Sequence, residues 1–206
     1  MNTLNKILSS RVMSFFSGLL LALLWSWFAY RHLNNFIETN SWSSLFFAII
    51  ETLAVCFYLL RSAPSSVSIN PFDWLVAFIG TFMPLSLRPE QYGMLPFGEY
   101  LIFLGAFFQT LSIISLNRSF ALVPAKRVIK TSYMYRIVRH PLYASYILGI
   151  TGYVLRYTSE VNLTIYIITM ISIGIRVIRE ESHLAKDSTY IEYMQKVRYR
   201  LIPFVF

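Results

Sequence analysis

The sequence has few of the residues that stabilise small secreted proteins or hold metal ions. Its 206 residues include one cysteine, Cys56, which excludes an intramolecular disulfide framework and any multi-cysteine metal site. The three histidines, His32, His140 and His183, are far apart and show no metal-ligand spacing. The eight glycines include no G-x-G-x-x-G pattern and no Walker loop, so neither common nucleotide cradle is present. We therefore expect no metal site.

Charge is also scarce. Only 14% of the residues are charged, against about 25% in soluble domains. Hydrophobic residues make up 56% of the chain, and the mean hydropathy is +0.54. This apolar content excludes a disordered chain and leaves too little polar surface to cover a globule in water. The composition predicts a polytopic membrane protein, with residues 1–206 forming a single integral membrane domain.

Long apolar segments predict about six membrane-spanning helices, since a bilayer core about 30 Å thick needs roughly 20 apolar residues per helix. The predicted spans are Val12–Tyr30, Ser44–Leu60, Phe72–Leu87, Gly98–Leu116, Pro141–Leu155 and Val161–Val177. The third and fifth give the weakest signals, which leaves a five-span alternative with one of these segments in the membrane interface. The expected fold class is an all-α, polytopic transmembrane helix bundle, with amino-terminal transmembrane helices in residues 1–116 and a second half in residues 117–206.

Positive charges gather on one side of the predicted spans. Fifteen of the 18 lysines and arginines fall on the side that holds both termini, and Arg31, Arg88 and Arg156 fall on the other. Cytoplasmic loops of membrane proteins carry an excess of lysine and arginine, so we expect both termini and the active site to be cytoplasmic. We interpret the net charge of +8 as orienting the chain and contacting lipid headgroups, and expect membrane lipids rather than nucleic acid as partners.

Glu51 lies in the middle of the second predicted span. A carboxyl group in hydrocarbon is costly and usually faces a cavity or a partner. It is either a contact in a functional site, or a helix-packing hydrogen bond or a protonated carboxyl group, and the sequence leaves these interpretations open. Gln109, in the fourth span, is interpreted as a hydrogen-bonding group between helices.

Residues 117–143, between the fourth and fifth spans, form a long connection of the kind that tends to be functional. Pro141 suits the first position of a helix and favours an extended backbone for His140. His140 would then lie at a helix N-terminus, where free N–H groups attract a carboxylate, with Tyr135 and Tyr143 on either side. The alternative is a basic loop that binds lipid headgroups.

After the sixth span, Arg176 and Glu180 are four residues apart and share a helix face. They form either an ion pair or a site in which the arginine orients an anion and the glutamate accepts hydrogen bonds from a bound group. Farther on, Ser188 is the predicted N-cap of a short amphipathic helix, with Tyr190 and Tyr193 on its apolar stripe.

Three segments, in this order, resemble the superfamily of isoprenylcysteine carboxyl methyltransferases and phospholipid methyltransferases, which are integral membrane enzymes. The segments are Tyr135…Arg139-His140-Pro141-Leu142-Tyr143, then Arg176-x-x-x-Glu180-Glu181, then Leu184…Tyr190-x-x-Tyr193…Val197…Arg200-Leu201-Ile202-Pro203. The resemblance runs from about Asn117 to the C-terminus. Two places depart from the family pattern. Tyr133-Met134 stands where a glycine usually begins the pair, and Asp187-Ser188 replaces a Phe-Gly.

The resemblance implies an S-adenosyl-L-methionine-dependent methyltransferase whose cofactor lies between the loop, the two-helix hairpin and the C-terminal helix. It implies cofactor contacts by Arg127, Val128, Ile129, Lys130, Tyr135, His140, Pro141, Leu142, Tyr143 and Glu180. It also implies that Arg176 binds the methyl acceptor and that Arg176 and Glu180 are the catalytic residues. We expect a hydrophobic or prenylated acceptor, the carboxylate of a prenylated cysteine or a similar hydrophobic acid.

Three alternatives stay open. One is a phospholipid amine N-methyltransferase, and another is an NADPH-dependent membrane sterol or enone reductase. The reductases typically place an asparagine before the tyrosine, where this chain has Leu142, and this argues against that class. The third is a non-enzymatic membrane subunit, which would bind no cofactor. The sequence carries no signal for an oligomeric state.

Overall fold

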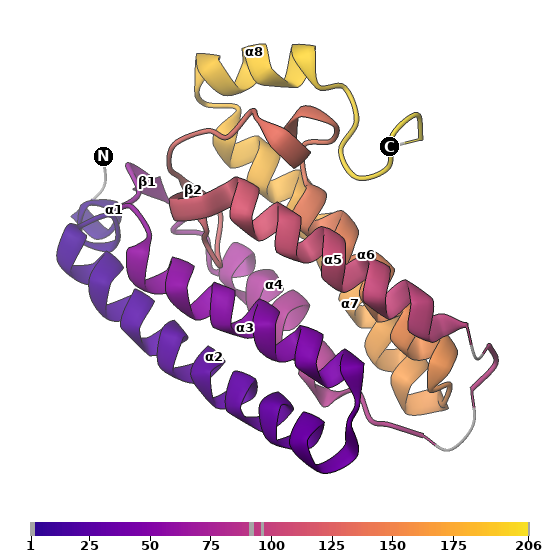
Figure 1. Cartoon of the computed structure of the whole chain (residues 1–206). Helices are drawn as coiled ribbons and strands as arrows, with labels where there is room; N and C mark the ends of the chain where they lie inside the picture. Colours follow the sequence, from indigo (N-terminus) through magenta and orange to yellow (C-terminus); the bar gives the residue numbers. More distant parts are fainter. Residues whose placement is uncertain (1–2, 91–92, 96, 206) are drawn as a thin grey trace.

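The computed structural model describes residues 3–90, 93–95 and 97–205, which are almost entirely helical (Figure 1). The α-helices in the described part are α1 (Thr3–Leu8), α2 (Arg11–Thr39), α3 (Trp42–Leu60), α4 (Pro71–Phe82), α5 (Gly98–Leu116), α6 (Pro141–Arg156), α7 (Glu160–Leu184) and α8 (Ser188–Lys196). Three short 3-10 helices are η1 (Met83–Ser86), η2 (Asn117–Ser119) and η3 (Tyr133–Arg136). The predicted all-α bundle is confirmed.

The long helices pack in pairs. Helices α2 and α3 form an antiparallel hairpin, joined at Asn40, whose left-handed backbone (φ 53°) ends α2. Helix α5 packs along α6, α4 packs on α7, and α3 contacts α5, so both halves of the chain meet in one bundle. Helix α8 lies across one end of the bundle (Figure 1).

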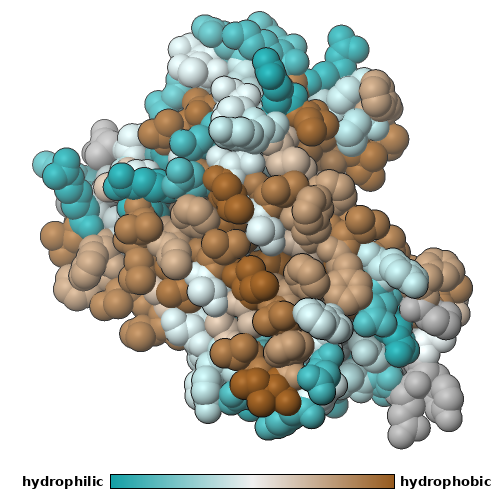
Figure 2. All heavy atoms as spheres, viewed as in Figure 1, coloured by the Kyte–Doolittle hydropathy of each residue, from teal (hydrophilic) through white to brown (hydrophobic). Residues whose placement is uncertain are grey.

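The surface of the bundle is apolar in the middle. Figure 2 shows hydrophobic side chains over the central part of the helices and hydrophilic ones gathered toward the ends, including around α8. In the described part, four helical segments are long and apolar enough to cross a membrane: Arg11–Thr39, Trp42–Leu60, Gly98–Ser119 and Glu160–Leu184. This pattern is that of an integral membrane protein.

The two segments that gave weak signals form the two shorter helices of this bundle. Helix α4 has 12 residues, about 18 Å at 1.5 Å per residue, and continues into η1, so the predicted span Phe72–Leu87 is divided. The break coincides with Pro84, which has no N–H to donate to the preceding helical turn. Helix α6 has 16 residues and matches its predicted bounds to within one residue. The number of six spans stays a prediction.

Close backbone contact between α5 and α6 depends on glycine. A Cβ atom on Gly105 would lie 2.5 Å from the backbone nitrogen of Gly149, well inside van der Waals contact. Small residues allow membrane helices to approach closely enough for dispersion contacts along their length. The close packing of α5 on α6 therefore depends on the absence of side chains at this crossing.

The end of the bundle near α8 is held by loops from both halves. Strands β1 (Ser66–Val67) and β2 (Ala125–Lys126) pair antiparallel, with Ser66 opposite Lys126, a ladder that the sequence did not predict. The Lys126 ammonium group lies 2.7 Å from the Asp187 carboxylate. The predicted N-cap of α8 was off by one residue. Asp187 caps the helix by accepting a hydrogen bond from the Thr189 N–H, because its backbone is extended and Ser188 is already helical.

Candidate active site

A cavity of about 100 Å³, partly open to solvent, lies at this end of the bundle between the loop of residues 117–143, α6, α7 and α8. The cavity brings together ten of the eleven predicted site residues: Arg127, Val128, Ile129, Lys130, Tyr135, His140, Leu142, Tyr143, Arg176 and Glu180. The eleventh, Pro141, is buried at the first position of α6 and is not among the described residues that line the cavity.

The amino-terminal half also contributes to this cavity. Trp25 of α2, Tyr58 of α3 and Thr81 of α4 line it. Sequence reasoning missed all three, because this half carries no motif and tertiary packing alone places these residues.

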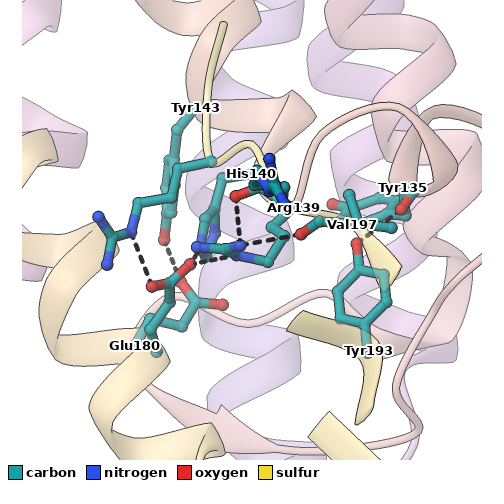
Figure 3. A network of polar contacts seen from close by, with 10 residues as sticks. Tyr135, Arg139, His140, Tyr143, Glu180, Tyr193 and Val197 are labelled. Carbon is teal, nitrogen blue, oxygen red and sulfur yellow. Dashed lines mark hydrogen bonds and ion pairs between the residues drawn. The ribbon is translucent and has the colours of Figure 1, made fainter. Parts of the chain in front are cut away.

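Glu180 is fixed by Tyr143. The Tyr143 hydroxyl donates a hydrogen bond of 2.7 Å to Glu180 Oε2, and Figure 3 shows the tyrosine pointing toward the carboxylate. Among the described residues, none donates to the second oxygen, Oε1. The side chain is half-buried and lines the cavity. Glu180 Oε1 is therefore available to accept a hydrogen bond from a bound group or to attract a bound cation.

Arg176 does not form the ion pair with Glu180 that its spacing allowed. Its guanidinium donates from Nη1 to Thr81 Oγ1 and from Nη2 to the Leu122 carbonyl, both at 2.8 Å. The Arg176 Cζ atom lies 5.0 Å from the centroid of the Tyr143 ring, a cation–π distance. The residue is only 5% exposed. Three elements thus hold a buried cation at the inner wall of the cavity.

His140 stacks on Tyr143, with ring centroids 5.6 Å apart. Its Nε2 atom lies 3.2 Å from Glu181 Oε1, and its backbone N–H donates to the Arg200 carbonyl at 2.8 Å. The sequence predicted a seat for a carboxylate at this helix N-terminus. The structure places a carboxylate of the protein itself, Glu181, on the imidazole.

Glu181 is a motif residue to which the sequence analysis assigned no role. It is buried and accepts from Arg139 Nε at 2.6 Å and from Arg200 Nε at 2.8 Å, so that it ties α7 to the loop and to the C-terminal tail. Successive residues on an α-helix point about 100° apart. This difference in direction separates Glu180, which faces the cavity, from Glu181, which faces the loop, although the sequence shows only two adjacent acids.

Helix α8 forms one wall of the cavity. Tyr190, Tyr193 and Val197 form a buried apolar cluster against Ile129 of the loop. The Tyr193 hydroxyl donates to the Tyr135 carbonyl at 2.6 Å (Figure 3). Burial raises the pKa of Tyr193 above its ordinary value, so the hydroxyl stays protonated and acts as a donor. The predicted amphipathic stripe therefore packs on the loop.

Arg127 carries the clearest signal for a ligand. Its Nε and Nη1 atoms are buried, and neither has a hydrogen-bond partner in the described part of the chain. Burial, with a smaller effect of the Arg61 charge, lowers the pKa of Arg127 to about 10, which leaves it charged at neutral pH. Buried charged donors are normally paired, because leaving them unpaired is costly. This guanidinium therefore fits an anionic group in the cavity.

The turn before Tyr135 differs from the family pattern at Tyr133. This residue has a left-handed backbone (φ 53°), a conformation that glycine adopts without strain. The family's usual glycine and the conformation of Tyr133 therefore agree. Tyrosine in place of glycine therefore keeps the turn, but the backbone of Tyr133, an exposed residue, is strained.

Together, these features define an integral membrane protein with a polar cavity at one end of an apolar bundle. Residues 94–188 match the family model of phospholipid methyltransferase, a segment that covers a little under half of the chain and runs from the loop before α5 to the start of α8. The match confirms the resemblance to the superfamily of integral membrane methyltransferases. This stretch is thus similar to phospholipid methyltransferases, and the match supports a membrane methyltransferase that acts on a lipid-like substrate. No curated protein matches it.

Proposed function

We propose that the protein transfers a methyl group from S-adenosyl-L-methionine to the carboxylate of a prenylated cysteine or of a similar hydrophobic acid. One observation carries the proposal. A buried arginine, Arg176, and an oriented carboxylate, Glu180, flank the same tyrosine, Tyr143, in a polar cavity that adjoins the apolar bundle. Such a site can hold an anion and a cation at the same time.

The residues on the loop side suit the methyl donor. Arg127 offers two buried N–H groups without a partner to the donor's carboxylate, and Lys130 adds a second positive charge. Glu180 and the ring faces of Tyr135 and Tyr143 suit a sulfonium cation. When bound, the donor supplies an activated methyl group, so the protein's contribution is alignment and the exclusion of water.

The residues on the bundle side suit an anionic acceptor. Arg176 is held in place by Thr81 and the Leu122 carbonyl, and it presents a fixed positive charge to a carboxylate. A carboxylate is ionised at neutral pH, so methylation requires no base.

A phospholipid amine is the second candidate acceptor, and the family model that matches the chain favours it. An amine is protonated at neutral pH and must lose a proton before it accepts a methyl group. The positive charges of Arg127, Lys130 and Arg176 favour the deprotonated amine but repel the cationic form. On these grounds we place the acid acceptor first.

We infer that the end of the bundle with α8 faces the cytoplasm, where a water-soluble donor is available. The excess of basic residues predicted for this side supports the orientation. Single cysteines at exposed positions, introduced after Cys56→Ala, test it. An impermeant maleimide should label position 133 only in inverted vesicles and position 42 only in right-side-out vesicles.

The reaction is tested with purified protein, labelled S-adenosylmethionine and two acceptors, N-acetyl-S-farnesyl-cysteine and phosphatidylethanolamine. The proposal predicts a methyl ester, whose label is released by mild base. If the label is found only in a base-stable N-methyl group, the acceptor is the phospholipid amine and not the acid. Calorimetric titration with the donor and with NADPH checks the cofactor, and binding of NADPH alone would overturn the assignment.

Two variants test the site. Glu180→Gln and Arg176→Ala should each abolish ester formation, while size-exclusion profiles stay those of the unaltered protein. Lys186→Ala serves as the control, since this residue is not among those that line the cavity. Ester formation at the unaltered rate in either site variant would contradict the assignment of that residue.

A further inference from the structure

A second cavity lies deeper in the bundle, among the membrane-embedded helices. It has a volume of about 550 Å³, is partly open to the surroundings, and lies between α2, α3, α4 with η1, α5 and α6. Most of its lining is apolar: Trp25, Trp27, Phe28, Phe47, Ile50, Pro84, Leu85, Leu87, Ile102, Ala106 and Ile150. Such walls suit hydrocarbon.

The two cavities adjoin at a shared rim. Trp25, Thr81 and Tyr146 line both of them. Thr81 also accepts a hydrogen bond from Arg176, so the rim lies directly beside the arginine assigned to the acceptor's carboxylate. A molecule held by Arg176 at its polar end would thus extend its apolar part into the second cavity.

A polar pair lines the second cavity away from the rim. His32 of α2 and Glu51 of α3 both line it, and the His32 Nδ1 atom lies 2.8 Å from Glu51 Oε2. Glu51 is buried, and the His32 ring packs beside Phe47. The helix-packing bond that the sequence left open for Glu51 is therefore present, but it also faces a lipid-sized space.

The distance from the rim to this pair is set by helix geometry. Trp25 and His32 are seven residues apart on α2, which corresponds to about 10 Å at 1.5 Å per residue. Tyr146 and Tyr153, which line the same cavity on α6, have the same spacing. The apolar part of the cavity is thus a passage of limited length.

We propose that the His32–Glu51 pair is the end stop that limits the length of the acceptor's hydrocarbon chain. This inference rests on the proposed function only in taking the occupant as the single hydrocarbon chain of the methyl acceptor. Pressing methylene groups against the pair removes it from its remaining polar surroundings, and desolvating polar groups is costly. Chains that end before the pair avoid this cost, and longer chains do not.

The test is a competition experiment that needs no methyl transfer. A cysteine derivative with an S-alkyl chain and a terminal diazirine is photo-crosslinked to the detergent-solubilised full chain without donor. Unlabelled S-geranyl-, S-farnesyl- or S-geranylgeranyl-N-acetylcysteine is added as a competitor before irradiation, and the decrease in crosslinking yields a dissociation constant for each. We expect crosslinks on residues 25–32 and 47–51, and a constant that rises sharply at one chain length.

The double variant His32→Ala with Glu51→Ala removes both partners, so that no single charge is left unpaired. Its ratio of dissociation constants, short chain over long chain, should rise about tenfold, the scale of discrimination by a few methylene groups in a pocket. The matched control is Asn35→Ala with Ser44→Ala. This pair is also a polar contact between α2 and α3, at 2.6 Å, but does not line the cavity. The control should leave the ratio unchanged.

An unchanged ratio in the His32/Glu51 double variant, with crosslinks still at the pair, would overturn the end stop. Crosslinking that a phospholipid displaces and S-farnesyl-N-acetylcysteine does not would assign the cavity to bilayer lipid and overturn it too. If no acceptor is methylated but the chain-length ratio shifts as expected, the end stop holds while the proposed reaction fails. The two claims are therefore tested separately.

Discussion

Arg139 donates from Nε to Glu181 Oε1 at 2.6 Å, and both side chains are buried. The same arginine donates from Nη1 to the carbonyls of Val197 and Arg198. One ion pair thus joins α7, the start of α6 and the segment after α8, the three elements that enclose the cavity. Glu181 holds these elements together, and its neighbour Glu180 is available to contact a ligand.

We expect Glu181→Gln to destabilise the protein strongly. The change leaves the buried Arg139 guanidinium without its counter-charge, and removing one partner of a buried pair costs about 3–5 kcal/mol. Thermal unfolding in detergent measures the loss. Glu180→Gln is the matched control and should stay within about 1 kcal/mol, because its hydrogen bond from Tyr143 survives and its side chain is only half-buried. Equal losses in both variants would refute this division of roles.

Thr81→Val should lower kcat about tenfold without unfolding the protein. Valine keeps the shape of threonine but removes the oxygen that accepts from Arg176 Nη1 at 2.8 Å, so the guanidinium loses one of its two fixed bonds. A small displacement of a group that positions the substrate can lower the rate by a factor of this size. Steady-state kinetics at saturating donor provide the measurement.

Thr81→Ser distinguishes positioning from packing in the same experiment. Serine restores the hydroxyl and lacks the methyl group, so kcat should return to within about twofold of the unaltered value. A serine variant as slow as the valine variant would show that the methyl group, and not the hydrogen bond to Arg176, matters.

Gly105→Ala should destabilise the bundle, since the added Cβ would lie 2.5 Å from the Gly149 nitrogen and force α5 away from α6. Overpacking of this kind costs about 1–3 kcal/mol. Gly174→Ala, in the middle of α7, has nothing within 4 Å of its new Cβ and should stabilise by up to about 1 kcal/mol through helix propensity. Melting temperatures of the two variants should therefore move in opposite directions, and a fall in both would contradict the interpretation.

Local signals in the sequence were enough to predict the helices. The bounds of α5 were predicted as observed, because a mostly apolar run lies between Gly98 and Asn117. The division of α4 from η1 was not predicted, since hydropathy does not register the hydrogen bond that Pro84 fails to make.

The site was predictable only where its residues are close in sequence. His140 and Tyr143 are three residues apart, and their stacking follows from one helical turn. The bond from Arg176 to Thr81 joins residues 95 positions apart, and no pattern in either segment indicates the other. The same holds for the unpaired Nε atom of Arg127, which becomes visible only when burial is known. Long-range contacts of this kind require the fold.

Tyr133→Gly should stabilise the protein, although most substitutions to glycine do the opposite. Tyr133 is 80% exposed and has a φ of 53°, so little packing is lost and the strain of a left-handed residue with a Cβ, about 1–2 kcal/mol, is relieved. The greater flexibility of glycine in the unfolded chain reduces this gain in stability by about 0.5–1 kcal/mol. The net gain should raise the melting temperature by up to about 4 °C. Tyr133→Ala keeps the Cβ and the strain, so it should give no rise. An equal rise in both variants would mean that loss of the exposed ring, and not relief of the backbone, is the cause.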